Sequence, residues 1–448
     1  MPTPRSRPAT RTLDVLLARR LADTPLAPRD QALATRLVYA ALAWQLRLDF
    51  HLAQLLHPPL ADLDPAVRVV LRLGLLQLLF FDRIPAHAAV DAAVRLVHAT
   101  RRHAAAGLVN AVLRRAATAG RNGLPLPDAR TDPMERQAIE WSHPRWLVER
   151  WAATFGADDA VALLAADNAA GPITVRANPL RTSPATLAAE LAAAGVSAAP
   201  GRWAPDALVI AHGGARIRDL PAWSGGRVAF QGEASQLVAR LVGSGAGEHV
   251  LDACAAPGGK ALAIGAAVGP GGWVVALDRK AAGLRELAGE ATRLGTPWIH
   301  AVGADATRPP LRSQFDAVLV DAPCSGLGTL RRHPELRWRR RPEDIPRLAA
   351  LQAEVLHGVA PLVAPDGVLV YAVCTLTREE NDDVVSGFVA AHPAFVVEPA
   401  GPHLPAAAAE LAGPDGFLRT LPHRHGLDGF FAARLRRRRD LDSPPGVR

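Results

Sequence analysis

Apolar, strand-like runs alternate with helix-like segments from Gly247 to Arg436, and this alternation constrains the fold more than any other feature. The runs lie at 249–253, 273–278, 298–302, 317–321, 368–373 and 429–435. Strands that alternate with helices predict a parallel, doubly wound sheet, in which ligands bind beyond the carboxyl ends of the strands. We therefore expect a Rossmann-like α/β domain with its functional residues at those strand ends.

A glycine-rich turn follows the first of these strands, in the motif LDACAAPGGK at 251–260. Such a turn lets a ligand approach the backbone and points helix N-terminal amides at an anionic group, although its spacing is not that of a dinucleotide fingerprint. Asp278 ends the second strand and is suited to accept hydrogen bonds from the ribose hydroxyls of an adenosyl group. Asp305 follows the third strand, where it can accept from an adenine amino group or orient a covering loop.

Two thiols are predicted at neighbouring strand ends, Cys324 in DAPCSG after the fourth strand and Cys374 in YAVCT after the fifth. With Cys254 they are the only cysteines, too few and too widely spaced for a disulfide framework or a structural zinc site, so we expect reduced thiols and no metal. A thiolate can add reversibly to C6 of cytosine, which makes C5 nucleophilic toward a sulfonium methyl group. A base must then remove the C5 proton before the thiol is eliminated. Asp321 is placed to pair with the base edge and stabilise charge during the addition.

The N-terminal part has a different pattern, because from Leu13 to Arg115 apolar residues recur at helical spacing without strand-like alternation. Prolines, among them Pro28, Pro65 and Pro85, fall between the predicted helices. We expect an all-helical domain at 11–118, preceded by a disordered arm at 1–10. Its basic groups around 101–103 and 107–115 indicate either an electrostatic footprint for RNA or a solvated helix face.

A Gly/Pro/Asp-rich stretch at 119–133 is typical of a linker. The following residues, 134–222, mix strand-like runs at 173–177 and 208–211 with a helix predicted at 184–194, which indicates a small α+β module. Short strands beside Arg176 and Arg181 suggest either a surface for a nucleic acid strand or a purely structural bridge. We assign the α/β domain to 223–436 and a basic tail to 437–448.

The formal net charge of +8 favours a polyanionic partner, such as RNA, DNA or an anionic membrane. The longest apolar stretch, 73–81, is too short to cross a bilayer, and the N-terminus has no signal-peptide pattern, so we expect a cytoplasmic protein without membrane contact. One arginine cluster directly follows the Cys324 motif, and we expect it to contact RNA phosphates. Its members are Arg331, Arg332, Arg337, Arg339, Arg340 and Arg341.

The motifs LDACAAPGGK, DAPCSGLGTLRRHPELRW, VYAVCTLTREEN and DGFFAARL resemble the bacterial Sun/Fmu branch of ribosomal RNA cytosine-5 methyltransferases. The segments LVYAALAWQLRLDF, LRLGLLQLLFFDRIPAHAAVDAAVRL and GLVNAVLRR are similar to the NusB-like RNA-binding domain of that branch, so the resemblance covers nearly the whole chain. It implies S-adenosyl-L-methionine as methyl donor, small-subunit ribosomal RNA as substrate, Cys374 as nucleophile and Cys324 as an aid to product release. The implied donor contacts are Cys254, Ala255, Ala256, Pro257, Gly258, Gly259, Lys260, Asp278, Asp305 and Asp321.

One segment departs from the family pattern, because Gln231-Gly232-Glu233-Ala234-Ser235 stands where the family has Gln-Asp-Ala-Ser. The extra acid is expected beside the donor pocket. Two alternatives keep parts of this interpretation. In the first alternative the fold is the same but the substrate is DNA or transfer RNA. Cys324 is then the nucleophile, as in cytosine-5 DNA enzymes. In the second, the chain is a binding protein whose methyltransferase-like half only clamps RNA.

Overall fold

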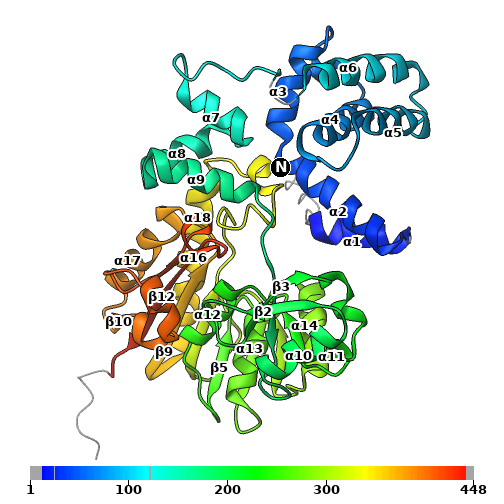
Figure 1. The fold of residues 1–448 in the computed structure, drawn as a ribbon. Coiled ribbons are helices and arrows are strands. Elements are labelled where there is room, and N and C mark those ends of the chain that lie inside the picture. Colours follow the sequence, from blue (N-terminus) through cyan, green and yellow to red (C-terminus); the bar gives the residue numbers. More distant parts are fainter. Residues whose placement is uncertain (1–12, 25, 121–122, 440–448) are drawn as a thin grey trace, which may run out of the picture. The chain divides into compact units, whose positions relative to one another are not determined.

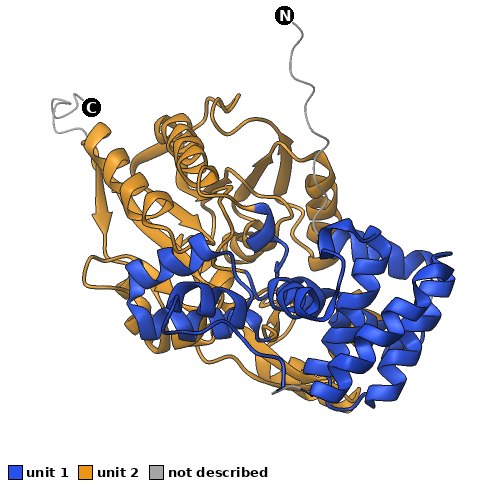
Figure 2. Cartoon of the chain, turned by 90° about the horizontal axis from the view of Figure 1, so that it is seen from above, with its two compact units in different colours: residues 1–169, 330–339 blue, residues 170–329, 340–448 orange. Residues whose placement is uncertain are grey.

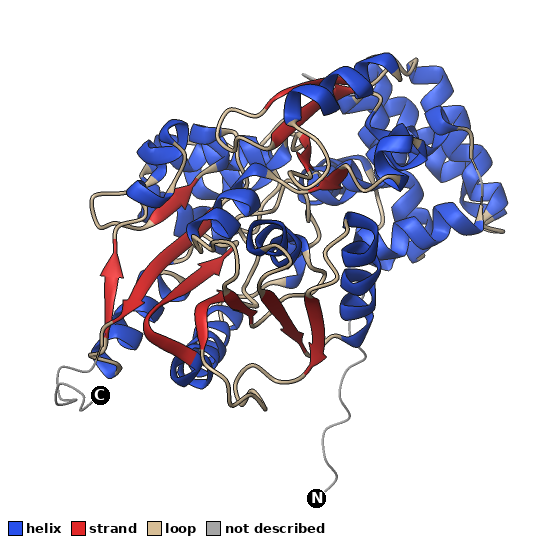
Figure 3. Cartoon of the chain, turned by 90° about the horizontal axis from the view of Figure 1, so that it is seen from below, coloured by secondary structure: helices blue, strands red, loops and turns tan. Residues whose placement is uncertain are grey.

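The computed structural model describes residues 13–24, 26–120 and 123–439, so the arm predicted at 1–10 and residues 440–448 of the predicted tail lie outside the described residues. The chain divides into two compact units, which Figure 2 colours separately. One unit comprises residues up to 169 together with 330–339, and the other comprises 170–329 and the residues from 340 onward. Within the described ranges every strand belongs to the second unit; Figure 3 draws the strands in red.

The first unit consists of helices. The apolar periodicity predicts those from 13 to 115. Its elements are α1 (Leu13–Asp23), α2 (Pro28–Ala43), α3 (Gln45–Leu55), η1 (Leu60–Asp62), α4 (Pro65–Phe80), α5 (Ala86–Ala99), η2 (His103–Ala105), α6 (Ala106–Ala119), α7 (Pro133–Trp141), α8 (Arg145–Phe155), α9 (Ala157–Asn168) and α15 (Leu336–Arg339). Pro28 and Pro65 begin helices, where a missing N–H leaves no bond unmade. Asp64 caps α4 by accepting from Ala66 N at 2.8 Å. No helix in the described part of the chain is both long and apolar enough to span a bilayer.

The core of the helical unit lies between α3, α4, α5 and α6. Leu52, Leu71, Leu75 and Leu113 are fully buried there. Helices α4 and α6 approach closely at Gly74, because a Cβ added at this position would lie 2.4 Å from Leu113 Cδ1. A side chain at 74 would displace Leu113, so this glycine serves helix packing and not a turn.

Residues 330–339 leave the second unit and pack within the helical unit. The side chain of Arg337, in α15, is fully buried. Its guanidinium donates to the carbonyl oxygens of Ala43 (3.1 Å), Ser142 (3.2 Å) and Asp167 (3.2 Å) and to Asn168 Oδ1 (2.7 Å). Burial lowers the pKa of Arg337 to about 10, although the charge of Asp167 opposes this shift. The hydrogen bonds of Arg337 therefore connect residues 330–339 to three segments of the helical unit.

The second unit begins with a small antiparallel sheet in the order β2-β3-β1-β4. Its elements are β1 (Ile173–Ala177), α10 (Pro184–Ala193), β2 (Ser197–Pro200), β3 (Ala207–His212), η3 (Gly214–Asp219), α11 (Pro221–Ser224) and β4 (Val228–Phe230). Val175, Leu187 and Leu208 are fully buried in the core of this sheet and its helices. The strands predicted at 173–177 and 208–211 and the helix predicted at 184–194 are confirmed within a residue or two. The short strands β2 and β4 were not predicted.

The large sheet has the order β10-β12-β9-β8-β5-β6-β7, and β11 pairs with β12. Figure 1 labels β10, β12, β9 and β5 of this sheet. Its strands are β5 (His249–Asp252), β6 (Trp273–Asp278), β7 (Ile299–Gly303), β8 (Phe315–Asp321), β9 (Val363–Val373), β10 (Phe395–Glu398), β11 (Leu418–Thr420) and β12 (Phe430–Arg437). The five strands β7, β6, β5, β8 and β9 pair in parallel, as predicted. The prediction of a fully parallel sheet is wrong at the other edge, where β12 runs antiparallel to β9, β10 and β11. An apolar run indicates a buried strand but carries no information on its direction.

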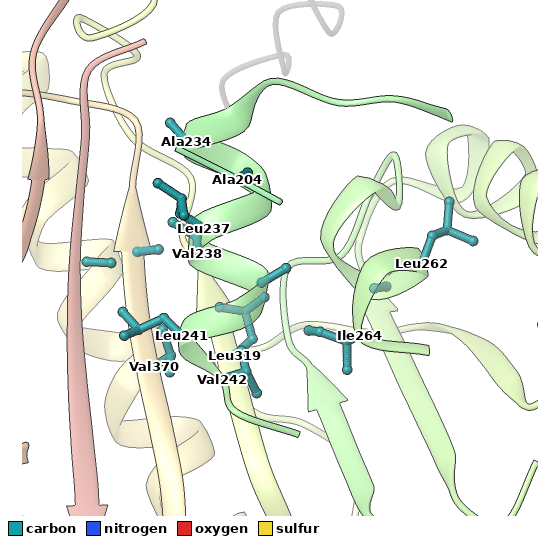
Figure 4. Packing of buried hydrophobic residues seen from close by; sticks show 14 of the residues in the cluster. Ala204, Ala234, Leu237, Val238, Leu241, Val242, Leu262, Ile264, Leu319 and Val370 are labelled. Atoms are coloured by element: carbon teal, nitrogen blue, oxygen red, sulfur yellow. The ribbon is translucent and has the colours of Figure 1, made fainter. Parts of the chain in front are cut away.

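Helices cover both faces of the large sheet. They are α12 (Glu233–Leu241), α13 (Gly259–Val268) and α14 (Ala281–Leu294) on one face and α16 (Asp344–Val359) and α17 (Asp382–Ala391) on the other. Leu319 of β8 belongs to the core with α12, whereas its neighbour Val318 belongs to the opposite core. Figure 4 shows Leu237 and Leu241 of α12 above Leu319 and Val370. Because successive strand residues are covered on opposite sides, these strands lack polar alternation.

Candidate active site

The predicted functional residues gather at one edge of the large sheet. Asp252, Asp278 and Asp321 are the last residues of β5, β6 and β8, and Cys374 follows the last residue of β9. These parallel strands all end at the same edge, so residues far apart in the sequence share one site. In the part of the chain that the structure describes, no three His, Cys, Asp or Glu side chains are grouped as metal ligands.

The glycine-rich turn between β5 and α13 depends on glycine at two positions. Gly258 has a φ of +116°, and an added Cβ would lie 2.7 Å from Leu287 Cγ, so both conformation and space exclude a side chain. At Gly259, the first residue of α13, an added Cβ would meet only Gln231 Nε2 at 3.9 Å. A ligand can therefore approach the backbone at Gly259 without a close contact, and N–H groups at the start of a helix can receive a carboxylate.

The two acids proposed for the adenosyl group also hold local structure. Asp278 Oδ2 accepts from Ala256 N at 3.0 Å and Oδ1 accepts from Lys280 N at 2.7 Å, so this carboxylate fastens the glycine-rich turn to the end of β6. Asp305 accepts from the backbone and hydroxyl of Thr307, and these bonds lower the pKa of Asp305. A carboxylate oxygen can accept more than one hydrogen bond, so contacts with ribose and adenine stay as predictions.

Lys260 connects the donor turn to the residues that were predicted to act on the base. Its Nζ lies 2.6 Å from Asp321 Oδ2 and 5.1 Å from the centroid of the Phe430 ring. Burial opposes its charge, but the carboxylate of Asp321 and the nearby Cys374 and Asp252 outweigh burial and raise the pKa of Lys260. The ammonium is therefore retained at neutral pH beside the predicted nucleophile. Sequence reasoning had assigned Lys260 to donor binding alone.

Asp252 is a buried acid that sequence reasoning did not include among the site residues. Asp252 is 1% exposed, and a hydrogen bond from the backbone of Cys254 only partly offsets the effect of burial on its carboxyl. Burial and the neighbouring charge of Asp321 raise the pKa of Asp252 to about 7, although Lys260 opposes the shift. Its place at the end of β5, in the motif with the glycine-rich turn, was the available signal.

The two predicted catalytic thiols are neighbours, with Cys324 Sγ 3.3 Å from Cys374 Sγ. A hydrogen bond to Cys374, burial and the charge of Glu380 raise the pKa of Cys324 well above its ordinary value. Cys324 thus keeps its proton at neutral pH. The third thiol differs, because burial and the charges of Asp252 and Asp278 raise the pKa of Cys254, which makes it unreactive.

The atypical loop at 231–235 is accounted for by its contacts. Glu233 is buried, and its Oε1 accepts from Trp203 N at 2.7 Å and from Ala204 N at 3.0 Å. The acid is therefore paired with backbone amides that follow β2 and does not add an unpaired charge to the donor pocket. Gln231 accepts from Arg176 Nε at 2.7 Å, and Arg176 is 5% exposed, which is incompatible with the suggested role of Arg176 in holding a nucleic acid strand.

The prediction that the whole arginine cluster contacts RNA phosphates is wrong for Arg337, which is fully buried and bonded within the helical unit. Arg340 is occupied as well, because it donates to the carbonyl oxygens of Cys324 (3.0 Å) and Ser325 (2.7 Å). Arg339 and Arg341 are exposed and stay candidates for phosphate contacts. A charge run in the sequence does not distinguish a buried guanidinium from an exposed one.

Of the basic residues predicted to form an RNA footprint on the helical unit, Arg101, Arg102 and His103 line a cavity of about 450 Å³. Arg101 is exposed and adopts a positive φ of 59°, whereas Arg102 Nε is bonded to Asp64 Oδ2 at 2.7 Å. The pairing reduces the net charge of this surface. RNA binding by these residues stays a prediction.

Comparison with protein families matches residues 241–436 to the 16S rRNA methyltransferase RsmB/F family. Residues 7–118 match the NusB family, and residues 143–215 match the ferredoxin-like domain of RsmF/B-like methyltransferases. These matches agree with the helical, small α+β and α/β parts of the chain. They also confirm the resemblance drawn from the motifs.

Similar proteins span nearly the whole chain. A probable ribosomal RNA small subunit methyltransferase B of Bacillus subtilis is 36% identical, with 95% of this chain and 94% of the relative covered. The ribosomal RNA small subunit methyltransferase B of Thermus thermophilus is 39% identical, with 94% and 93% covered. The crystal structure of PH0851 superposes with a TM-score of 0.79 at 26% identity and covers 93% of both chains. NSun6 from Pyrococcus horikoshii with SFG, at 22% identity and a TM-score of 0.58, shares the fold over 66% of this chain and 99% of that one.

Proposed function

The chain belongs to the 16S rRNA methyltransferase RsmB/F family, and we propose that it methylates C5 of a cytosine in small-subunit ribosomal RNA through a covalent adduct between Cys374 and C6. The observation that carries this proposal is the pair of thiols, Cys324 and Cys374, with sulfurs 3.3 Å apart. Methyl transfer to a nitrogen or oxygen needs no such pair. Transfer to C5 needs a nucleophile that adds to C6 and a second group that handles a proton.

The residues around the glycine-rich turn fit S-adenosylmethionine. Open space at Gly259 leaves room for the carboxylate end of the donor, and Asp278 and Asp305 supply acceptors for ribose and adenine. The proposed donor set is the turn Cys254 to Lys260 together with Asp278, Asp305 and Asp321. When bound there, S-adenosylmethionine supplies a methyl group on a sulfonium, which a carbon nucleophile can attack.

The charges beside Cys374 suit it for addition. The buried ammonium of Lys260 lies near Cys374, so a positive charge is held where the nucleophile is proposed to act. Asp321 is hydrogen-bonded to Lys260 at 2.6 Å, which holds its carboxylate at the strand end. In the proposed reaction the Asp321 carboxylate accepts a hydrogen bond from the N4 amino group of the base while the Cys374 sulfur forms a bond to C6. The electron pair of the C5–C6 double bond thereby becomes available at C5.

Cys324 is suited to the opposite half of the reaction. Its raised pKa keeps it a thiol, and its sulfur lies 3.3 Å from the sulfur of Cys374. After C5 has been methylated and has lost its proton to a base, the bond between C6 and the Cys374 sulfur breaks. Cys324 can then donate a proton to the departing sulfur. The opposite assignment, with Cys324 as nucleophile, is disfavoured because a hydrogen bond to Cys374 and burial raise the pKa of the Cys324 thiol.

Bisulfite sequencing tests the proposed substrate and position of methylation. Small-subunit ribosomal RNA is compared from cells with the gene, without it, and with the gene restored as Cys374→Ala. We expect one cytosine that resists conversion only when the intact gene is present. Conversion of all cytosines in every strain would exclude cytosine-5 methylation of this RNA and would favour a binding role.

A further inference from the structure

A buried carboxylate lies beneath the two cysteine loops, at Glu380. This residue ends the short turn η5 (Arg378–Glu380), six positions after Cys374, and its side chain is fully buried. A buried acid is costly unless its oxygens are hydrogen-bonded, so its partners indicate what it stabilises. Neither the predicted donor set nor the proposed chemistry includes it.

Each oxygen of Glu380 serves a different cysteine loop. Oε1 accepts from the backbone N–H of Ser325, next to Cys324, at 2.8 Å. Oε2 accepts from the hydroxyl of Thr377 at 2.8 Å and from that of Thr375, next to Cys374, at 3.3 Å. The side chain therefore spans from the loop after β8 to the loop after β9. Ser325 Oγ and Thr375 Oγ1, 2.7 Å apart, join the same two loops directly.

A second ring of contacts holds Glu380 itself. Gln352 Nε2, from α16, donates to Glu380 Oε1 at 3.0 Å and lies 3.0 Å from the carbonyl oxygen of Pro323. Tyr371 Oη lies 2.6 Å from the carbonyl oxygen of Glu380 and 3.0 Å from Gln352 Oε1. Gln352, Tyr371, Ser325 and Thr375 are all fully buried. Because these partners of Glu380 are buried and hydrogen-bonded, water cannot replace a contact that Glu380 loses. A small change in the Glu380 side chain should therefore shift the two cysteine loops.

We propose that Glu380 is a positioning residue that sets the separation of Cys324 and Cys374 by bridging the loops that carry them. The inference rests on the proposed function, in which both thiols act on the same base. The length of the Glu380 side chain is the important property in this proposal. Its one planar carboxylate must hydrogen-bond to Ser325 on one side and to Thr375 and Thr377 on the other. A role of its negative charge on the thiols is the competing explanation.

Two substitutions of Glu380 distinguish the effect of side-chain length from the effect of charge. Glu380→Gln keeps the length and shape, because its oxygen can accept from Ser325 and Gln352 while its amide group donates to the threonine hydroxyls. Glu380→Asp keeps the charge but is one methylene shorter, so it cannot meet both loops at once. Glu354→Gln, at an exposed position of α16, is the matched control for loss of a carboxylate.

The first measurement reports thiol separation without RNA or donor. Diamide takes two protons and two electrons from a pair of thiols, and the sulfurs must close from 3.3 Å to about 2.05 Å to form a disulfide. Peptide mapping identifies the Cys324–Cys374 product. We expect Glu380→Asp to slow closure by about tenfold, and Glu380→Gln and Glu354→Gln to stay within about twofold of the parent.

The second measurement is methylation of small-subunit ribosomal RNA at varied donor concentration. Glu380→Asp should lower kcat by about 10–100-fold with little change in KM for the donor, because the donor residues are untouched. Glu380→Gln should restore most of kcat. The proposal is overturned if Glu380→Asp closes the disulfide at the parental rate, or if it stays active while Glu380→Gln does not, which would assign the role to charge.

The two proposals fail in different ways. A parent enzyme that leaves no 5-methylcytosine would reject the proposed function, whereas the diamide rates would still test the placement of the thiols. If Glu380→Asp does not fold, Thr377→Val removes one donor to Oε2 with little change in shape. It should slow closure of the disulfide in the same direction, and a parental rate in that variant would overturn the bridge.

Discussion

The Sγ atoms of Cys324 and Cys374, fifty residues apart in the sequence, lie 3.3 Å apart in the structure. Their surroundings differ, since a hydrogen bond to Cys374, burial and the charge of Glu380 raise the pKa of Cys324, while the ammonium of Lys260 lies near Cys374. The proposed division of labour therefore follows from the surroundings of each thiol. It leads to predictions that separate the two.

Serine substitutions should block the reaction at different steps. Cys374→Ser should abolish both methylation and any covalent adduct, because a serine hydroxyl has almost no alkoxide near neutral pH. Cys324→Ser should still add and transfer the methyl group but stall at elimination, which leaves protein attached to RNA. A nuclease-sensitive band of reduced mobility on a denaturing gel reports the adduct. An adduct in Cys374→Ser and none in Cys324→Ser would reverse the assigned roles.

The two lysines of the chain form a matched pair for a test of electrostatics. Lys260→Met removes a buried ammonium beside Asp321 and Cys374, and we expect kcat to fall by about 10²–10³-fold, as when one preorganised electrostatic donor is lost. Lys280→Met removes an exposed ammonium and should change kcat by less than about threefold. Single-turnover methylation with saturating RNA measures both. Equal effects of the two changes would argue against a specific role for Lys260.

Asp252 should make the stability of the donor-free protein depend on pH. The pKa of its carboxyl is raised from 3.8 to about 7 in the folded state, so the folded state binds this proton more tightly than the unfolded state does. The contribution of Asp252 to the free energy of unfolding is fully present below about pH 4. It declines as the pH rises to about 7 and does not change further above that pH. Asp252→Asn cannot ionise, so it should lack this decline.

The difference is measurable by urea unfolding of the parent and Asp252→Asn between pH 4 and pH 8.5. Across this window we expect the free energy of unfolding of Asp252→Asn to rise relative to that of the parent. The difference should reach about 4 kcal/mol above pH 7, which is the free-energy equivalent of the pKa shift. Asp316→Asn, at an exposed acid of β8, serves as control and should show no such trend. Parallel stability curves for the parent and Asp252→Asn would show that Asp252 ionises normally.

Substitutions of two arginines in α15 should affect different properties of the protein. Arg337→Met leaves buried carbonyl groups without their donor and should lower the free energy of unfolding by about 3 kcal/mol. Arg339→Met, at an exposed position, should leave stability unchanged but reduce the salt dependence of RNA binding by somewhat under one log unit of slope. Urea unfolding and RNA titrations at several salt concentrations separate these effects. An unaltered slope would make Arg339 a solvated side chain.

Local sequence patterns determined the architecture of this protein to a large extent. Helical spacing in the N-terminal part and alternating strands and helices from 247 to 436 predicted the two main folds, because burial of one helical face or of both strand faces selects residues at short, regular intervals. The same patterns placed Asp278, Asp321 and Cys374 at strand ends. Since parallel strands end at a common edge, a shared site followed without any knowledge of side-chain positions.

Tertiary structure alone decided what depends on contacts between distant segments. The antiparallel direction of β12, the burial of Arg337 among Ala43, Ser142 and Asp167, and the bridge made by Glu380 each join parts of the chain whose separation no periodicity encodes. An arginine or a glutamate has the same signature in a sequence whether water or protein surrounds it. Its partners, and with them its pKa and its role, arise only when the fold removes water from one side chain and leaves it around another.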